Sequence, residues 1–271
     1  MGPIGVFDSG YGGLTILKEI RKALPQYDFM YLGDNARAPY GTRSFDVVYE
    51  FTLQAVKALF ARGCHLVILA CNTASAKALR SIQQKDLPAI DPSRRVLGVI
   101  IPTVETLGDI SANGNIGLLA TPGTVSSGTY DIEIAKFFPK FRTVSHACPM
   151  WVPLVENREY DGPGADYFVE KDVNALFAEE PDTDTIVLGC THYPLLLPKI
   201  EKAVAGRARI VTQGHLVAAS LADYLSRHPE IDAECSKDGS VTYLTTEHPD
   251  KFTGMASVFM EQPVTARRIE L

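Results

Sequence analysis

Two cysteines follow matching apolar runs in this chain. Cys71 ends LVILAC and is followed by NTAS, whereas Cys190 ends TIVLGC and is followed by THYP. A free cysteine is often a small buried hydrophobic residue, and taken singly each of these fits that role. However, the start of a helix after a strand supplies backbone N–H groups and a dipole that favour a thiolate. Because the same context occurs twice, we interpret both thiols as chemically active.

Two identical acid–base groups suit a reaction that inverts a carbon centre. One group removes a proton from one face, the other delivers a proton to the opposite face, and the roles exchange in the reverse direction. A hydrolase or lyase that uses one thiol as a nucleophile stays open, because His192 is close to Cys190. The phosphatase pattern fails, since Lys77 occupies the place of the arginine six residues after Cys71.

Further polar residues follow other apolar runs. Asp8 ends PIGVFD and leads into a glycine-rich turn, and Asp34 ends DFMYLGD. The turn is no dinucleotide fingerprint, because Thr15 stands where the last glycine should be. We expect its N–H groups to bind a carboxylate, with Asp8 acting either as a helix cap or in proton transfer. Thr121 and Thr124 form either a second anion site or a plain helix cap.

The elements that must position these residues alternate along the chain. Runs such as HLVILA and NIGLLAT are typical of buried strands, and segments such as GLTILKEIRKAL have helical spacing. The alternation predicts βαβ crossovers, an α/β fold and mostly parallel sheets. Ligands of such sheets bind beyond the carboxyl ends of the strands. We therefore expect the polar strand ends to share one crevice, lined by the loop GDNARAPYGTRS unless that loop is merely a surface loop.

Composition excludes several classes of protein. The 271 residues are 46% hydrophobic and 21% charged, with a net charge of −6 and scattered basic residues, which argues against a nucleic-acid or membrane-surface partner. No apolar run reaches the ~20 residues of a membrane span, and the first residues do not resemble a signal peptide. We therefore expect a cytoplasmic protein. Neither a disulfide framework nor a metal site is expected, because the five cysteines are dispersed and form no CxxC.

Several blocks of the sequence together resemble the cofactor-independent Asp/Glu racemase superfamily, and its glutamate-specific branch most of all. They occur in that family's order: IGVFDSGYGGLT, GDNARAPYG, ACNTASA, ATPGTV, VPLVE and LGCTHYPLL, with YLTTEHPDKF near the C-terminus. The resemblance covers nearly the whole chain. Departures are mild: Asn35 and Ala38 stand where Thr and Val are usual, and ACPMWVP carries Trp151.

The resemblance implies two flavodoxin-like domains with the active site in the cleft between them. The first domain would comprise residues 1–97 and 208–271, and the second residues 98–207. It also implies interconversion of L- and D-glutamate without a cofactor or metal, supply of D-glutamate for peptidoglycan, and a homodimer. Aspartate remains an alternative substrate, and a non-catalytic binding protein remains an alternative of another class.

The same resemblance implies roles for particular residues. Cys71 and Cys190 would be the acid–base thiols, assisted by Asp8 and His192 respectively. Asp34 and Glu156 match further acidic positions that are proposed as helpers. Positions that match or are expected to contact the substrate are Ser9, Pro39, Tyr40, Gly41, Asn72, Thr73, Thr121, Thr124 and Thr191.

Overall fold

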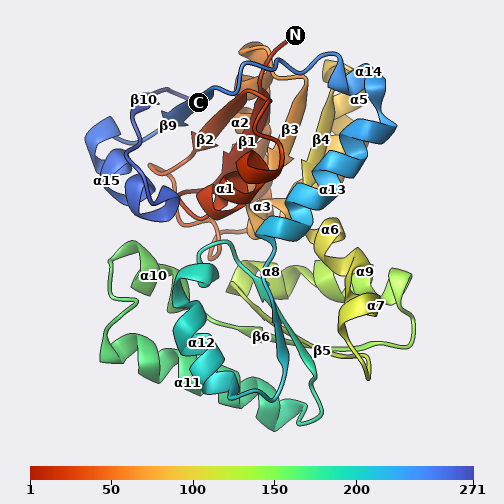
Figure 1. The fold of residues 1–271 in the computed structure, drawn as a ribbon, viewed down its shortest axis with the longest axis vertical. Coiled ribbons are helices and arrows are strands. Elements are labelled where there is room, and N and C mark those ends of the chain that lie inside the picture. Colours follow the sequence, from red (N-terminus) through yellow and green to blue (C-terminus); the bar gives the residue numbers. More distant parts are fainter. The chain divides into compact units, whose positions relative to one another are not determined.

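A computed structural model describes all of residues 1–271. The chain forms two compact units, one comprising Met1–Val99 with Gly214–Leu271 and the other Ile100–Gln213. Each unit contains one sheet, and every strand pairing in both sheets is parallel (Figure 1). The predicted α/β fold with parallel sheets is therefore confirmed. None of the helices combines the length and the apolar character that a membrane crossing requires.

The first unit is built on a six-stranded sheet with the order β10-β9-β2-β1-β3-β4. Its strands are β1 (Ile4–Asp8), β2 (Phe29–Gly33), β3 (Leu66–Leu69), β4 (Arg95–Gly98), β9 (Val241–Thr245) and β10 (Ala266–Arg268). Its helices are α1 (Gly13–Ala23), α2 (Phe45–Ala61), α3 (Asn72–Lys77), α4 (Leu79–Ser81), the π-helical η1 (Ile82–Asp86), α5 (Leu87–Ile90), α13 (Gly214–Arg227), α14 (Pro229–Asp232) and α15 (Pro249–Met260).

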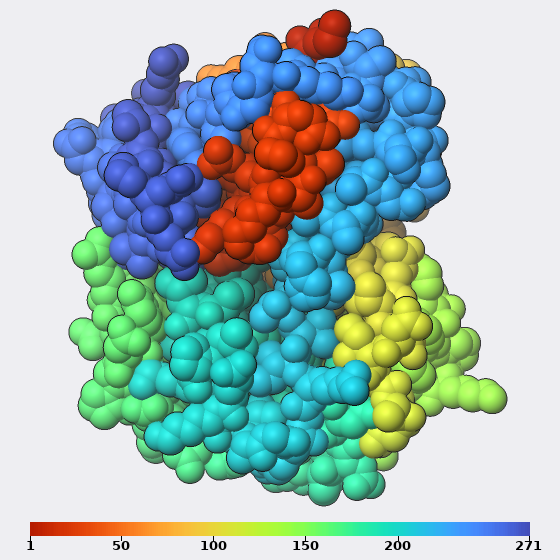
Figure 2. Space-filling model, viewed as in Figure 1, coloured from red at the N-terminus to blue at the C-terminus, as the bar shows by residue number.

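Apolar stripes on the helices attach them to this sheet. Helix α1 buries Leu14, Ile16, Leu17 and Ile20, which recur at helical spacing. It lies between α13 and α15 and contacts both, as the band of α1 residues in Figure 2 shows. Helices α2 and α3 pack together in a core cluster that also contains residues of β1 and β3. The helix expected over TASAKALRSIQ is instead divided into α3, α4 and the π-helical turn η1.

The second unit has a four-stranded sheet with the order β6-β5-β7-β8. Its strands are β5 (Asn115–Ala120), β6 (Arg142–Ala147), β7 (Thr185–Gly189) and β8 (Arg209–Val211). Its helices are α6 (Ile100–Glu105), α7 (Leu107–Ile110), α8 (Pro122–Ser127), α9 (Thr129–Phe137), α10 (Trp151–Glu156), α11 (Pro163–Glu179), the 3₁₀-helical η2 (Tyr193–Leu196) and α12 (Leu197–Val204). Residues 208–213, which the sequence predicts to lie in the first domain, include β8, and β8 pairs with β7 in this sheet.

The two sheets share an order that determines where ligands bind. In each, the unit's first strand lies between its second and third, with the fourth beyond the third: β2-β1-β3-β4 and β6-β5-β7-β8. The direction of winding reverses between first and third strand, and open α/β sheets bind ligands at that switch point, beyond the carboxyl ends. Cys71 follows β3 and Cys190 follows β7, so the two thiols occupy equivalent places in the two units.

Candidate functional site

The first half-site is formed where the neighbouring strands β1 and β3 end. Parallel pairing of Phe7 with Leu69 brings the following residues of both strands to one edge of the sheet. There, Ser9 Oγ lies 3.4 Å from Cys71 Sγ. The backbone N–H of Ala74 donates to the same sulfur over 3.5 Å, so that Cys71 caps α3. The Ala74 N–H, a donor directed at the sulfur, favours the thiolate over the thiol.

Asp8 is held within the glycine-rich turn. Its Oδ2 accepts a hydrogen bond from the Gly10 N–H over 2.9 Å, and the side chain is buried. Gly13 allows α1 to start against it, because a Cβ at Gly13 would lie 2.6 Å from the Asp8 Cβ. Tyr31 donates to the Gly10 carbonyl over 2.9 Å. Burial raises the pKa of Tyr31 well above its usual range, and the charges of Asp8 and Cys71 raise it further. This donor therefore stays neutral.

The first turn of α3 completes this half-site. Asn72 and Thr73 directly follow Cys71, and both are buried. Ser75, one turn further on, donates to the carbonyl of Leu69 and accepts from the N–H of Val99, which ties α3 to the end of β3. The cysteine is therefore presented by a helix whose first turn is fixed by hydrogen bonds.

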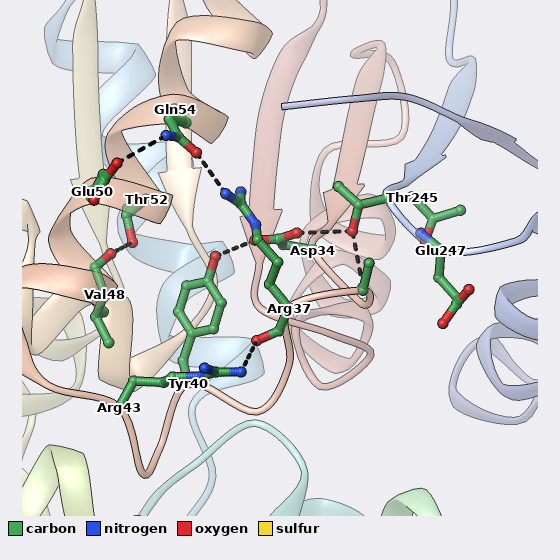
Figure 3. A network of polar contacts seen from close by, with 12 residues as sticks. Asp34, Arg37, Tyr40, Arg43, Val48, Glu50, Thr52, Gln54, Thr245 and Glu247 are labelled. Carbon is green, nitrogen blue, oxygen red and sulfur yellow. Dashed lines mark hydrogen bonds and ion pairs between the residues drawn. The ribbon is translucent and has the colours of Figure 1, made fainter.

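The loop after β2 is held by the polar network of Figure 3. Asp34 is fully buried and accepts hydrogen bonds from Tyr40, from Arg37 Nε at 2.7 Å and from Thr246 Oγ1 at 2.8 Å. Arg37 also donates to Gln54 on α2 over 2.6 Å. Both carboxylate oxygens of Asp34 are thus engaged in holding the loop in place. This arrangement gives Asp34 a positioning role.

The three predicted contact residues of this loop differ in their surroundings. The Tyr40 ring is buried against Phe7 and Phe51, and its hydroxyl group is bonded to Asp34, so only its backbone is left for a ligand. Gly41 is half-buried, and Pro39, which follows a cis peptide bond, is exposed. Their contact with a substrate remains a prediction.

The second half-site repeats this arrangement at the ends of β5 and β7. Ala120 and Gly189 are paired, so Thr121 and Cys190 follow at neighbouring strand ends. Thr121 caps α8: its Oγ1 accepts from the Thr124 N–H over 3.2 Å and lies 3.1 Å from the Thr124 hydroxyl. Both threonines, Cys190 and Thr191 are buried. The helix cap foreseen for Thr121 is present, which leaves the anion-site interpretation untested.

Cys190 is supported by a histidine rather than by a helix N–H group. Its Sγ lies 3.8 Å from His192 Nδ1, and His192 Nε2 lies 3.0 Å from Glu156 Oε1. Burial lowers the pKa of His192, but hydrogen bonds to Cys190 and Glu156 outweigh this and hold the pKa well above its usual value. A charged imidazolium then has an N–H to donate toward each partner, Glu156 and Cys190.

Two buried aromatic side chains pack together near the segment that carries this second thiol. The hydroxyl of Tyr193 donates to the carbonyl of Cys148 over 3.3 Å, and its ring lies 4.7 Å from that of Trp151, centroid to centroid. Both rings are fully buried. Tyr193 is close to Cys190 in sequence, and Trp151 begins the helix that ends at Glu156. The contact between the two rings therefore joins the segment that carries Cys190 to the helix that carries Glu156.

Comparison with known proteins assigns the chain to a family. The model of the Asp/Glu/Hydantoin racemase family matches residues 4–222. The chain belongs to the Asp/Glu/hydantoin racemase family. A glutamate racemase of Ruegeria pomeroyi is 42% identical over 277 residues, covering 97% of this chain and 98% of that protein.

Solved structures agree along the full length. A glutamate racemase isoform from Bacillus anthracis superposes with a TM-score of 0.90 at 31% identity, covering 100% of this chain and 98% of the other. A glutamate racemase from Francisella tularensis in complex with D-glutamate gives a TM-score of 0.86 at 29% identity, covering 99% and 96%. The resemblance read from the sequence is therefore confirmed, as is the racemase class of enzyme.

The remaining cysteines of this racemase have different surroundings. Burial raises the pKa of Cys64 to about 12 and of Cys235 to about 11, and that of Cys148 lies well above its usual range for the same reason. All three are thiols at neutral pH, and a thiol is a poor nucleophile. No group of three or more His, Cys, Asp and Glu side chains is placed to hold a metal ion.

Some residues that shape the site of this racemase had no signal in the sequence. Thr246 reaches Asp34 from a segment that is remote along the chain, and Arg37 and Gln54 meet only because α2 packs beside the loop. A sequence pattern shows polar residues in a loop but not the pairs they form. Lys77 is a further case, because its burial is not visible in the sequence.

Proposed function

We propose that this racemase interconverts L- and D-glutamate, using Cys71 and Cys190 as a matched pair of acid and base. The observation that carries the proposal is the placement of the two thiols at equivalent switch points of two sheets with the same strand order. The choice of glutamate is supported by the relative of 42% identity over 97% of the chain, which is a glutamate racemase.

In the proposed reaction, one cysteine is a thiolate and the other a thiol. The thiolate takes the proton from Cα, the C–H electron pair is left as carbanionic charge, and the opposite thiol donates its proton to the other face. The product has inverted configuration, and the two sulfurs have exchanged their protonation states. The mechanism requires both thiols to reach one Cα from opposite faces.

The two thiols are supported in different ways. At Cys71 the Ser9 hydroxyl and the Ala74 N–H face the sulfur, and Asp8 lies in the adjoining turn. At Cys190 the partner is His192, whose charge is stabilised by Glu156. A hydroxyl and an amide are neutral donors, whereas an imidazolium carries a full charge. We therefore expect the two half-reactions to respond differently to pH.

A thiolate is a weak base toward an amino-acid Cα–H, so the site must stabilise the charge that develops. Hydrogen-bond donors that are fixed before the reaction do this most effectively where water is excluded. The buried residues next to the thiols supply such groups in our proposal: Ser9, Asn72, Thr73, Thr121, Thr124 and Thr191. Their directional bonds to the substrate carboxylates would also fix its orientation.

We also propose a physiological role that depends on this activity. D-Glutamate made in this way would supply peptidoglycan synthesis. A cytoplasmic location and a homodimer stay predictions from the sequence, as does activity without a cofactor.

The test is a racemisation assay on purified protein treated with EDTA and with a carbonyl reagent that removes pyridoxal phosphate. Circular dichroism should show L-glutamate and D-glutamate converging on the same racemic end point. In D₂O the product should carry deuterium at Cα in place of hydrogen, with no C–C or C–N bond broken. Faster turnover of L-aspartate than of L-glutamate would instead identify an aspartate racemase. Glutamate binding without any Cα exchange would identify a binding protein.

A further inference from the structure

Lys77 is a buried cation without an acidic partner. The residue is 7% exposed, and its Nζ makes one hydrogen bond, to the backbone carbonyl of Arg43 over 2.8 Å. Lysine is rarely buried unless it is paired, because removing an ammonium group from water is costly. Burial accordingly lowers the pKa of Lys77. Burying this charge in the first half-site costs folding free energy, which indicates that Lys77 has a role there.

The acceptor of this hydrogen bond belongs to the loop of the candidate site. The N–H of Arg43 donates to the carbonyl of Tyr40 over 3.0 Å, which closes a turn around Gly41. The guanidinium of Arg43 also donates to the carbonyl of Arg37 over 3.2 Å. Lys77 therefore holds the far end of the loop, and the network around Asp34 holds its beginning (Figure 3).

Lys77 also belongs to the helix that presents a thiol. It is the last residue of α3, which begins at Asn72 and is capped by Cys71. A lysine in the last turn often serves to neutralise the helix dipole. Here, however, the ammonium donates to the loop that precedes α2 and not to a carbonyl of α3 itself. The hydrogen bond thus joins the Cys71 helix directly to the turn at 40–43.

We propose that Lys77 is a positioning residue that fixes the turn at 40–43 against the helix of Cys71, and so holds the Gly41 backbone ready for the substrate. The inference rests on the proposed function, because it assigns the turn to substrate binding. A buried charged donor suits this task. The Arg43 carbonyl is a single acceptor, and a hydrogen bond from a charged donor to it is roughly twice as strong as one from a neutral donor.

The decisive variant is Lys77→Met, which keeps an apolar stem of similar length and removes the ammonium. Lys85→Met is the matched control, since Lys85 is exposed on the neighbouring η1. Lys77→Arg retains a cation with several donors. The three proteins and the wild type are compared by thermal unfolding, by hydrogen–deuterium exchange of peptides covering residues 38–44, and by KM and kcat for both enantiomers of glutamate.

We expect Lys77→Met to unfold no earlier than the wild type, because a costly buried charge has been replaced by an apolar side chain. Exchange within 38–44 should nevertheless become faster, and KM should rise about tenfold with kcat changed less than about threefold, as loss of a hydrogen bond to a charged group predicts. Lys77→Arg should protect the peptide better than Lys77→Met, and Lys85→Met should match the wild type.

Three results would overturn the inference. Unchanged exchange in 38–44 would mean that Lys77 does not fix the turn, and unchanged KM with faster exchange would mean that the turn does not serve the substrate. A fall in unfolding temperature that accounts for lost activity would assign Lys77 to the stability of the core. The exchange measurement needs no turnover, so a wild type that fails to racemise glutamate would refute the proposed function and still leave the anchoring testable.

Discussion

Replacing Glu156 by Gln tests how the second thiol is supported. The carboxylate accepts from His192 Nε2 at 3.0 Å, and His192 lies 3.8 Å from the Cys190 sulfur. Glutamine keeps the size and one acceptor but removes the charge that stabilises the imidazolium. The pKa of His192, held high in the wild type, should fall, and the alkaline limb of the pH–rate profile should move to lower pH.

The expected loss can be worked from the contact. Charge centres about 4 Å apart interact by about 4 kcal/mol at an effective dielectric of about 20. The side chain of Glu156 is 25% exposed, so water screens part of this energy. Glutamine also keeps one oxygen that can accept the hydrogen bond from His192, which further reduces the energy that is lost. A hydrogen bond to a charged group contributes about 1.5–3 kcal/mol, which corresponds to a 10- to 150-fold fall in kcat/KM above neutral pH.

The assay is circular dichroism of glutamate racemisation from pH 6 to pH 10, starting from each enantiomer. Glu159→Gln is the control, because Glu159 is an exposed residue just beyond the same helix. Cα–H exchange in D₂O should be slowed unequally for L- and D-glutamate. In the proposed mechanism, Cys190 removes the Cα proton of only one enantiomer, and Cys71 removes that of the other. An alkaline limb at the wild-type position, or a loss equal to that of Glu159→Gln, would refute the role of Glu156.

Three further predictions concern the thiols and the fold. Cys71→Ser and Cys190→Ser should each lower racemisation at least about 100-fold in the circular dichroism assay, and near-wild-type turnover in either would contradict the two-thiol mechanism. Asp28 is buried, and although burial raises its pKa, hydrogen bonds from the loop at 236–240 lower it to about 2. Its contribution of about 2 kcal/mol is present above pH 4 and lost as the pH falls toward 2, so urea unfolding of Asp28→Asn should show a smaller acid dependence than the wild type. Gly117→Ala places a Cβ 2.5 Å from Leu176 Cδ2 and should cost about 1–3 kcal/mol in the same unfolding experiment, whereas an unchanged midpoint would mean that Leu176 moves aside freely.

The sequence predicted the architecture well, because the signals involved are local and strong. Apolar runs that end in Asp8, Cys71 and Cys190 were recognisable as buried strands, and their alternation with helices predicts parallel sheets. The third helix was predicted less well. Its pattern is continuous from Thr73, but the structure contains a π-helical turn, and periodicity alone does not show where a helix changes its hydrogen-bonding.

The candidate site was predicted by residue type and less by geometry. The sequence placed Asp34 and Tyr40 in one loop but did not show that they bond to each other and that Tyr40 is buried. Hydrogen bonds between distant segments, such as Thr246 to Asp34, depend on how the elements pack. In the sequence, Lys77 only breaks a phosphatase pattern, since a lysine in a helix gives no sign that it will be buried.

The single tryptophan of the chain gives the second half-site an optical signal of its own. Trp151 is fully buried and packs on Tyr193, whose neighbours in the sequence include His192 and Cys190. An indole that is shielded from water emits at short wavelength, and no other indole in this protein contributes to the spectrum. Fluorescence excited at the tryptophan band therefore reports on the surroundings of Cys190. Titrating glutamate into Cys71→Ser would show whether the second half-site senses the ligand when turnover is blocked.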